Sequence, residues 1–254
     1  MEHPDRHRAG DAIAIDGDYQ ARAIVSPRRA QRFWHEAKLR LIDRVAPALS
    51  DSRIADAGCG SGVIAAHLAK RAAVVTGFDL NSAAVAFATQ TFGSETLRFV
   101  LGPFERIPDY GPFDQIYCIE VLEHMYEEQA VETLRVFAQA ARPGGELFVT
   151  TPNVRSAWPA IEWTLDRLSL VPKLNEAQHL TLFSRVTLAR AFRQAGWVIE
   201  EIGTFNGLAP FLAPVSARAA SLVERMEFVG RRQLPLNLLY CRASLPRGTG
   251  SRQP

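Results

Sequence analysis

A glycine-rich loop between an apolar strand and an apolar helix constrains this fold more than any other feature. Residues 54–62 read Ile-Ala-Asp-Ala-Gly-Cys-Gly-Ser-Gly, so Gly58, Gly60 and Gly62 follow the acidic Asp56. Glycine lacks a Cβ, adopts positive φ readily and lets the backbone approach a ligand, and a helix begins with N–H groups that lack helical partners. The pattern predicts a strand, a tight turn and a helix that bind a nucleotide-like cofactor.

A second acidic residue strengthens this interpretation. Asp79 ends the apolar run at 73–78, which predicts a second strand. A carboxylate at that point can accept hydrogen bonds from two ribose hydroxyls. The dinucleotide fingerprint requires Gly or Ala at position 63, where this chain has Val63. The spacing therefore argues against an NAD-dependent oxidoreductase.

The order Asp-x-Gly-x-Gly-x-Gly, followed by an acid that ends the next strand, resembles motifs I and II of class I S-adenosylmethionine (SAM)-dependent methyltransferases. The resemblance implies that the loop packs against the methionine and ribose parts of SAM, and that the second acid holds the ribose. The cofactor-binding residues it implies are Asp56, Gly58, Cys59, Gly60, Gly62, Asp79, Leu80, Phe104 and Glu120.

One part of this pattern departs from the family. Residues 102–108, Gly-Pro-Phe-Glu-Arg-Ile-Pro, stand where many methyltransferases have Gly-Asp-Ala-Glu-x-Leu-Pro. Pro103 replaces the acid that usually contacts the adenine amine. We therefore expect adenine to be held by the backbone of Phe104 and by apolar packing.

The stretch at 113–125, Phe-Asp-Gln-Ile-Tyr-Cys-Ile-Glu-Val-Leu-Glu-His-Met, carries most of the chemistry. Its apolar part predicts a strand, and Glu120, Glu123 and His124 follow at the carboxyl end, where ligands bind in open α/β sheets. The stretch resembles the Glu-Val-Leu-Glu-His signature of the ubiquinone-biosynthesis O-methyltransferases and the wider family around them.

Three interpretations of this cluster stay open. His124 can act as a general base, since its ordinary pKa near 6.5 suits proton removal at neutral pH. Alternatively, Glu120, Glu123 and His124 bind a divalent cation such as Mg²⁺ that lowers the pKa of the acceptor. The third interpretation is a structural turn. His179, in residues 178–184, resembles a histidine that several relatives place near the acceptor, so the catalytic candidates are His124, Glu123 and His179.

Length and composition fit one decorated domain, because 254 residues with 47% hydrophobic content can form one sizeable α/β core. We predict a Rossmann-like, seven-stranded class I methyltransferase sandwich with helical lid insertions. The resemblance implies the strand order 3-2-1-4-5-7-6, with the seventh strand antiparallel. The predicted parts are an N-terminal tail at 1–26, a methyltransferase domain at 27–245 with its cofactor half at 50–153, a lid insertion at 154–180, a second insertion at 204–235, and a disordered tail at 246–254.

Three segments outside the motifs have patterns that indicate their roles. Residues 27–49 have helical apolar spacing, which predicts a helix whose default role is packing. Residues 154–180 are too long and too apolar for a slack link and suit an acceptor lid. Residues 204–235 combine apolar side chains with arginines, a composition that fits an acceptor wall, a homodimer contact, an anionic membrane surface or simple packing.

Charge and cysteine content set further limits. A net charge of +2 gives no argument for nucleic acid as a partner. The three cysteines have no paired spacing, which is typical of reduced thiols and a cytoplasmic protein. The sequence contains neither a signal-peptide pattern nor an apolar run long enough for a transmembrane helix.

We expect methyl transfer from SAM to a hydroxyl oxygen of a small, largely apolar acceptor. SAM carries its own leaving group, so the protein mainly aligns the acceptor and removes a proton. The alternatives are an N- or C-methyltransferase acting on a small metabolite and a non-catalytic SAM-binding protein. The sequence lacks an Asn-Pro-Pro-Tyr motif, which would indicate an amino group on nucleic acid or protein.

Overall fold

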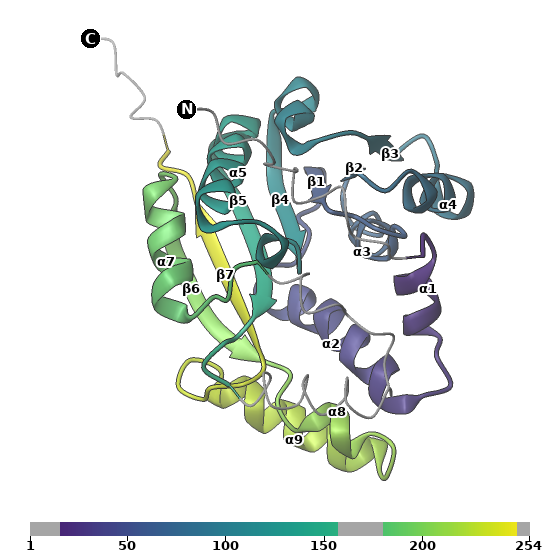
Figure 1. Ribbon diagram of the computed structural model, residues 1–254. Helices are drawn as coiled ribbons and strands as arrows, with labels where there is room; N and C mark the ends of the chain where they lie inside the picture. The colour runs from purple at the N-terminus through teal and green to yellow at the C-terminus, as the bar shows by residue number, and fades with distance from the viewer. Residues whose placement is uncertain (1–15, 157–179, 248–254) are drawn as a thin grey trace, which may run out of the picture.

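The computed structural model describes residues 16–156 and 180–247, and a seven-stranded sheet forms its centre (Figure 1). The strand order is β3-β2-β1-β4-β5-β7-β6, with β1 to β5 parallel and β7 antiparallel to both β5 and β6. This confirms the predicted topology. The strands are β1 (Arg53–Ala57), β2 (Val74–Asp79), β3 (Leu97–Leu101), β4 (Phe113–Ile119), β5 (Ala141–Pro152), β6 (Val198–Phe205) and β7 (Leu238–Ser244).

Helices cover both faces of this sheet (Figure 1). The α-helices are α1 (Tyr19–Ile24), α2 (Arg29–Val45), α3 (Val63–Leu68), α4 (Ser82–Phe92), α5 (Glu127–Ala140), α7 (Arg185–Gln194), α8 (Ala209–Leu212) and α9 (Ala217–Gly230). Two short 3₁₀ helices, η1 (Phe104–Tyr110) and η2 (Leu122–His124), precede and follow β4.

Strand β4 shows how one run of residues supplies two cores. Successive side chains of a strand point to opposite faces. Ile116 and Cys118 accordingly join the core beneath α5 and α7, whereas Tyr117 and Ile119 join the core beneath α2 and α3. All four side chains are buried. A parallel strand covered on both faces therefore reads as a continuous apolar run, as the sequence does.

Side-chain caps stabilise the starts of two helices. The Asn81 side chain accepts hydrogen bonds from the N–H groups of Ala83 and Ala84 at 3.0 and 3.1 Å, at the start of α4. The Ser184 hydroxyl accepts from the Thr187 N–H at 3.3 Å, at the start of α7. Each bond satisfies a helix N–H that has no helical partner, an effect worth about 1 kcal/mol.

Strand β5 includes residues with a turn-like composition. The run Arg-Pro-Gly-Gly at 142–145 is typical of a turn after a helix, but the strand starts at Ala141, which pairs with Phe113. The register then shifts between Phe113 and Gln115, and Gly144 lies in the left-handed region at φ 77°. The Pro-Gly-Gly run is therefore an irregularity within the strand.

Residues 19–24, assigned to the N-terminal tail by the sequence, form helix α1. Ala23 of this helix is 2% exposed, and α1 lies against α2. Helix α1 has only six residues, and its sequence has little apolar periodicity. Tertiary contacts, rather than local propensity, explain why it forms.

The structure describes the two predicted insertions to different extents. Most of 154–180, including His179, lies outside the described residues, but its two ends meet. The Val154 N–H donates to the Phe183 carbonyl at 2.9 Å, and the N–H groups of Leu180 and Thr181 donate to the Glu123 carbonyl at 2.8 and 3.1 Å. The second insertion forms α8 and α9, which lie along α2 (Figure 1). Within the described residues, no helix is long and apolar enough to cross a membrane.

Candidate active site

Asp56 is the penultimate residue of β1, just before the glycine loop, and it is buried. Its side chain is 1% exposed and accepts a hydrogen bond from the Ala65 N–H. The Oδ2 atom has no hydrogen-bond partner among the residues that the structure describes. Burial, followed by the nearby charge of Asp79, raises the pKa of Asp56 to about 7. The site therefore holds a carboxyl that gains from a donor or a positive charge.

Asp79 fastens the glycine loop to the end of β2. One carboxylate oxygen accepts the Gly60 N–H at 2.7 Å, and the other accepts the Asn81 N–H at 2.8 Å. The N–H groups of Gly58 and Cys59 both donate to the Phe78 carbonyl, at 2.8 and 3.0 Å. Each carboxylate oxygen still has a second lone pair for a ligand. The two acids of the predicted cofactor motif are thus neighbours across the ends of β1 and β2.

The outer two glycines are required by protein packing. Gly58 and Gly62 have φ values of 78° and 81°, where a side chain is strained. A Cβ on Gly58 would lie 2.3 Å from Val121, and one on Gly62 would lie 2.8 Å from Phe99. Their conformations and their neighbours both exclude a side chain before any ligand is considered.

Gly60 instead faces helix α1. A Cβ on Gly60 would lie 2.8 Å from Oε1 of Gln20, and the Ala21 N–H donates to the Ser61 hydroxyl at 3.0 Å. Gln20 Oε1 is buried and has no hydrogen-bond partner in the described part of the chain. An unpaired buried oxygen of this kind costs about 1–3 kcal/mol. Sequence reasoning missed Gln20 because α1 has no motif and weak periodicity.

Three predicted contact residues occupy different surroundings. The Cys59 side chain is 1% exposed beside Gly77, and burial raises the pKa of its thiol well above the ordinary range. Leu80 is 43% exposed at the end of β2. The Phe104 ring stacks edge-on against Phe137 at 5.8 Å between centroids, so the ring belongs to the core. The predicted adenine contact through the Phe104 backbone stays a prediction.

Glu120 occupies a strained position directly after β4. It has φ 56°, a region that ordinary side chains avoid at a cost of about 1–3 kcal/mol. Its N–H donates to the Thr150 carbonyl at 2.9 Å. One carboxylate oxygen forms a close ion pair with Lys38 of α2, and the other is buried without a partner among the described residues. A strained backbone and a buried carboxylate oxygen without a hydrogen-bond partner in the described part of the chain coincide at this residue.

Lys38 is the main functional candidate that sequence reasoning missed. It is 6% exposed and lies on the buried face of α2 with Leu41 and Ile42. A lysine next to apolar residues in a helix is usually interpreted as solvent-exposed, beside the face that packs. The position of Lys38 on the apolar face was the available signal, because a buried ammonium group needs an acidic partner.

Lys38 also influences a neighbouring histidine. Burial, together with the charge of Lys38, lowers the pKa of His35 to about 3, so this imidazole is neutral at neutral pH. The Tyr19 ring packs edge-on against it at 6.0 Å. Helices α1 and α2 together thus bring Tyr19, Gln20, His35 and Lys38 into one region over the strand ends.

Glu123 and His124 lie in η2 but face different environments from Glu120. Glu123 is 2% exposed and accepts a hydrogen bond from the Thr151 hydroxyl at 2.9 Å. Burial, and then the charge of Glu120, raises the pKa of Glu123 to about 8, so its carboxyl is mostly neutral at pH 7. His124 is half-buried.

This geometry does not support the magnesium hypothesis. Glu120 is paired with Lys38, and Glu123 is buried against Thr151. Within 16–156 and 180–247, no three His, Cys, Asp or Glu side chains are grouped so that they could bind a metal ion. The base interpretation of His124 and the structural-turn interpretation remain.

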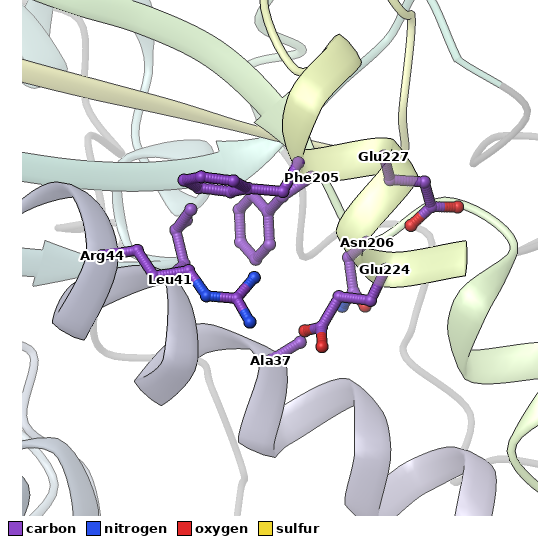
Figure 2. A pocket seen from close by; sticks show the side chains of 8 residues that line it. Ala37, Leu41, Arg44, Phe205, Asn206, Glu224 and Glu227 are labelled. Atoms are coloured by element: carbon purple, nitrogen blue, oxygen red, sulfur yellow. The ribbon is translucent and has the colours of Figure 1, made fainter. Parts of the chain in front are cut away.

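The pocket drawn in Figure 2 lies away from the glycine loop, between α2 and α9. It is lined by Ala37, Leu41, Arg44, Phe205, Asn206, Glu224, Glu227 and Phe228. Its walls are a helix–helix junction with two inward-facing glutamates. We therefore interpret it as part of the attachment of α9.

Comparisons with known proteins cover the same region. A family model described as a methyltransferase domain matches residues 28–202. A ubiquinone biosynthesis O-methyltransferase from Thiobacillus denitrificans is 31% identical over 180 residues, which are 67% of this chain and 75% of the relative. One from Idiomarina loihiensis is 30% identical over 199 residues, 76% of each chain.

A solved structure shares the fold. The magnesium protoporphyrin IX methyltransferase from Synechocystis, crystallised with bound SAH, superposes with a TM-score of 0.59. It is 16% identical in sequence and covers 90% of this chain and 94% of its own. At that identity the likeness concerns the arrangement of strands and helices.

Proposed function

Since the chain belongs to the methyltransferase-domain family and is a SAM-dependent methyltransferase, we propose that its acceptor atom is a hydroxyl oxygen on a small, largely apolar molecule. The supporting observation is the similarity, over 67–76% of this chain, to relatives that are named O-methyltransferases. We propose the same type of reaction, O-methylation, for this chain, but not the same acceptor molecule.

The residues around the glycine loop fit a cationic cofactor. Asp56, Gln20 and Glu120 each direct a buried oxygen that no described residue satisfies, and SAM carries both a sulfonium and an ammonium group. We assign Asp56 and Gln20 to the methionine part and Asp79 to the ribose. When bound, SAM supplies an activated methyl group together with its leaving group. The protein residues contribute binding, orientation and exclusion of water.

For proton removal we propose His124. It follows β4 in η2, at the carboxyl end of the sheet where ligands bind in this fold class. The neighbouring Glu123 is buried and largely neutral, which makes it a poor base at neutral pH. We assign Glu123 a positioning role, because its carbonyl accepts the N–H groups of Leu180 and Thr181. His179 stays a second candidate for contact with the acceptor.

The acceptor proposal is tested with SAM that carries a deuterated methyl group. The full chain is incubated with a phenol bearing a hydrocarbon tail, the same phenol without the tail, and the tailed aniline. Mass spectrometry should detect a labelled methyl ether, formed fastest from the tailed phenol. A labelled amine with no ether would contradict oxygen transfer, and equal rates for the two phenols would contradict an apolar acceptor site.

His124→Gln tests the base in the same assay. Loss of a general base costs on the order of 10²–10⁴ in rate, so kcat should fall while SAM affinity, measured by calorimetry, stays unchanged. Raising the pH toward the pKa of the phenol, about 10, should partly restore the variant, because the phenolate needs no base. An unaffected kcat would leave the structural-turn interpretation of His124.

A further inference from the structure

Helix α9 distributes its charges unevenly. Its two acidic residues face inward, where Glu224 pairs with Arg40 of α2 at 2.8 Å. Glu227 is 7% exposed and accepts the N–H groups of Gly207 and Leu208 at 3.2 and 2.5 Å. Figure 2 shows the Glu224 carboxylate directed toward Ala37 of α2. The negative charge of this helix is therefore turned toward the protein.

The outward side of α9 is apolar and cationic. Leu222, Met226 and Val229 are 60%, 65% and 80% exposed, and their spacing of four and three residues aligns them on one stripe. Arg218 and Arg225 are exposed along the same stripe, at the same helical spacing from Leu222. A solvated helix face normally has polar or charged residues where this helix has Leu222, Met226 and Val229.

The same surface continues through α8 and the link between the two helices. Leu208 is 69% exposed, Phe211 41% and Val215 85%. Singly exposed apolar residues are normal on a protein surface, but six such residues on adjoining helices form a patch of the kind that marks an interaction site. We call this patch the α8–α9 surface: Leu208, Phe211, Val215, Arg218, Leu222, Arg225, Met226 and Val229.

Its place in the fold relates it to the active site. Strand β6 runs antiparallel to β7, which runs antiparallel to β5, so β6 ends at the same rim of the sheet as β1 and β4. The chain passes from that end of β6 into α8 and α9 (Figure 1). The α8–α9 surface therefore borders the rim that carries the glycine loop and η2.

We propose that the α8–α9 surface docks on the surface of an anionic lipid bilayer. An amphipathic helix with apolar and arginine side chains on its outer side lies in the interface, held by apolar burial and by attraction to acidic headgroups. Charge complementarity selects this occupant, because the outward charges of α9 are arginines and its acids are sequestered. Docking in this way would turn the substrate-binding rim toward the bilayer, independently of which atom accepts the methyl group.

The proposal is tested by flotation of the full chain with phosphatidylcholine vesicles, with and without roughly one-third phosphatidylglycerol. The protein should float with the anionic vesicles, far less with the neutral ones, and less as salt concentration rises. Arg218→Glu with Arg225→Glu should reduce the bound fraction at least about tenfold. Leu222→Ser with Met226→Ser should reduce it by a similar factor.

Helix α7 supplies the matched control. Arg190 and Arg193 are exposed on the opposite side of the sheet, so Arg190→Glu with Arg193→Glu makes the same charge change elsewhere. These control substitutions should leave flotation unchanged. Equal loss in both charge-reversed proteins, or no flotation with anionic vesicles, would overturn the proposal. So would a dimer in light scattering that the Leu222→Ser/Met226→Ser protein fails to form, since a second copy would then cover the surface.

Discussion

At the scale of single residues, Gly60 separates the demands of cofactor binding from those of backbone conformation. It has φ 49° and faces Gln20, whereas Gly196 has φ 87° with no atom within 4 Å of an added Cβ. An alanine is strained at both positions, by about 1 kcal/mol, but only at Gly60 does it also displace a side chain that we assign to SAM.

Gly60→Ala should therefore weaken SAM binding about tenfold or more, while Gly196→Ala should lower only the free energy of unfolding. Calorimetric titration with SAM and urea unfolding of the two variants make the comparison. The assignment of Gln20 and Gly60 to the cofactor is contradicted by a Gly60→Ala protein that binds SAM as tightly as the Gly196→Ala protein does.

At the scale of elements, the ion pair between Lys38 and Glu120 joins α2 to the end of β4. Breaking a buried pair leaves one charge uncompensated, so Lys38→Met or Glu120→Gln alone should destabilise the protein by about 3–5 kcal/mol. The double substitution should recover most of that loss. Urea unfolding of the four proteins forms a double-mutant cycle that measures the coupling.

An exposed pair on α5 is the control for this cycle. Arg135 and Glu132 lie 2.9 Å apart with side chains 49% and 62% exposed. Their coupling should be below about 0.5 kcal/mol, because solvent screens it. A coupling between Lys38 and Glu120 no larger than this would show that the buried pair does not hold α2 in place.

Elements with strong local signals were predictable from the sequence. The glycine loop and the apolar runs of β1, β2 and β4 each carry their signal within a few residues, and the family resemblance supplied the seven-stranded order. Helix α1 and Lys38 were not predicted. Their roles depend on partners distant in the chain, Ser61 and Glu120, which no local pattern reveals.

At the scale of the whole molecule, buried ionisable groups on different elements set one pH profile. Burial raises the pKa of Asp56 to about 7 and of Glu123 to about 8, and it lowers that of His35 to about 3. Burial alone would raise the pKa of Glu201, but hydrogen bonds from Tyr240 and two arginines lower it to about 2. The groups with raised pKa values reduce stability above the pH of greatest stability, and those with lowered pKa values reduce it below that pH.

The signs follow from which state holds the proton. Folded Asp56 and Glu123 keep protons that the unfolded chain releases above its ordinary carboxyl pKa, so stability falls as pH rises from about 4 toward 8. His35 and Glu201 have lowered pKa values, so their contributions are lost as pH falls, from about 6.5 to 3 and from about 4.5 to 2. Without ligand, stability should be greatest near pH 4 to 5.

Urea unfolding across the range from about pH 5 to pH 8 should show the free energy of unfolding decreasing by about 1.4 kcal/mol per pH unit for each net proton. Glu123→Gln should flatten the decline above about pH 6.5, because glutamine does not titrate yet still accepts the Thr151 hydroxyl. An identical slope in the wild type and this variant would contradict the buried, neutral state of Glu123.

The backbone contacts that anchor both ends of the segment between Val154 and Leu180 have a consequence for acceptor specificity. Residues 153 and 183 form a bridge, and the chain that leaves at Val154 is fastened again at Leu180 and Thr181. Since exit and return are anchored to the sheet, a replacement of the intervening segment by one of another length costs little extra loop-closure entropy, about 0.6 kcal/mol per doubling. We propose that exchanging this segment for one of another length changes the acceptor preference while the sheet and the glycine loop keep their structure.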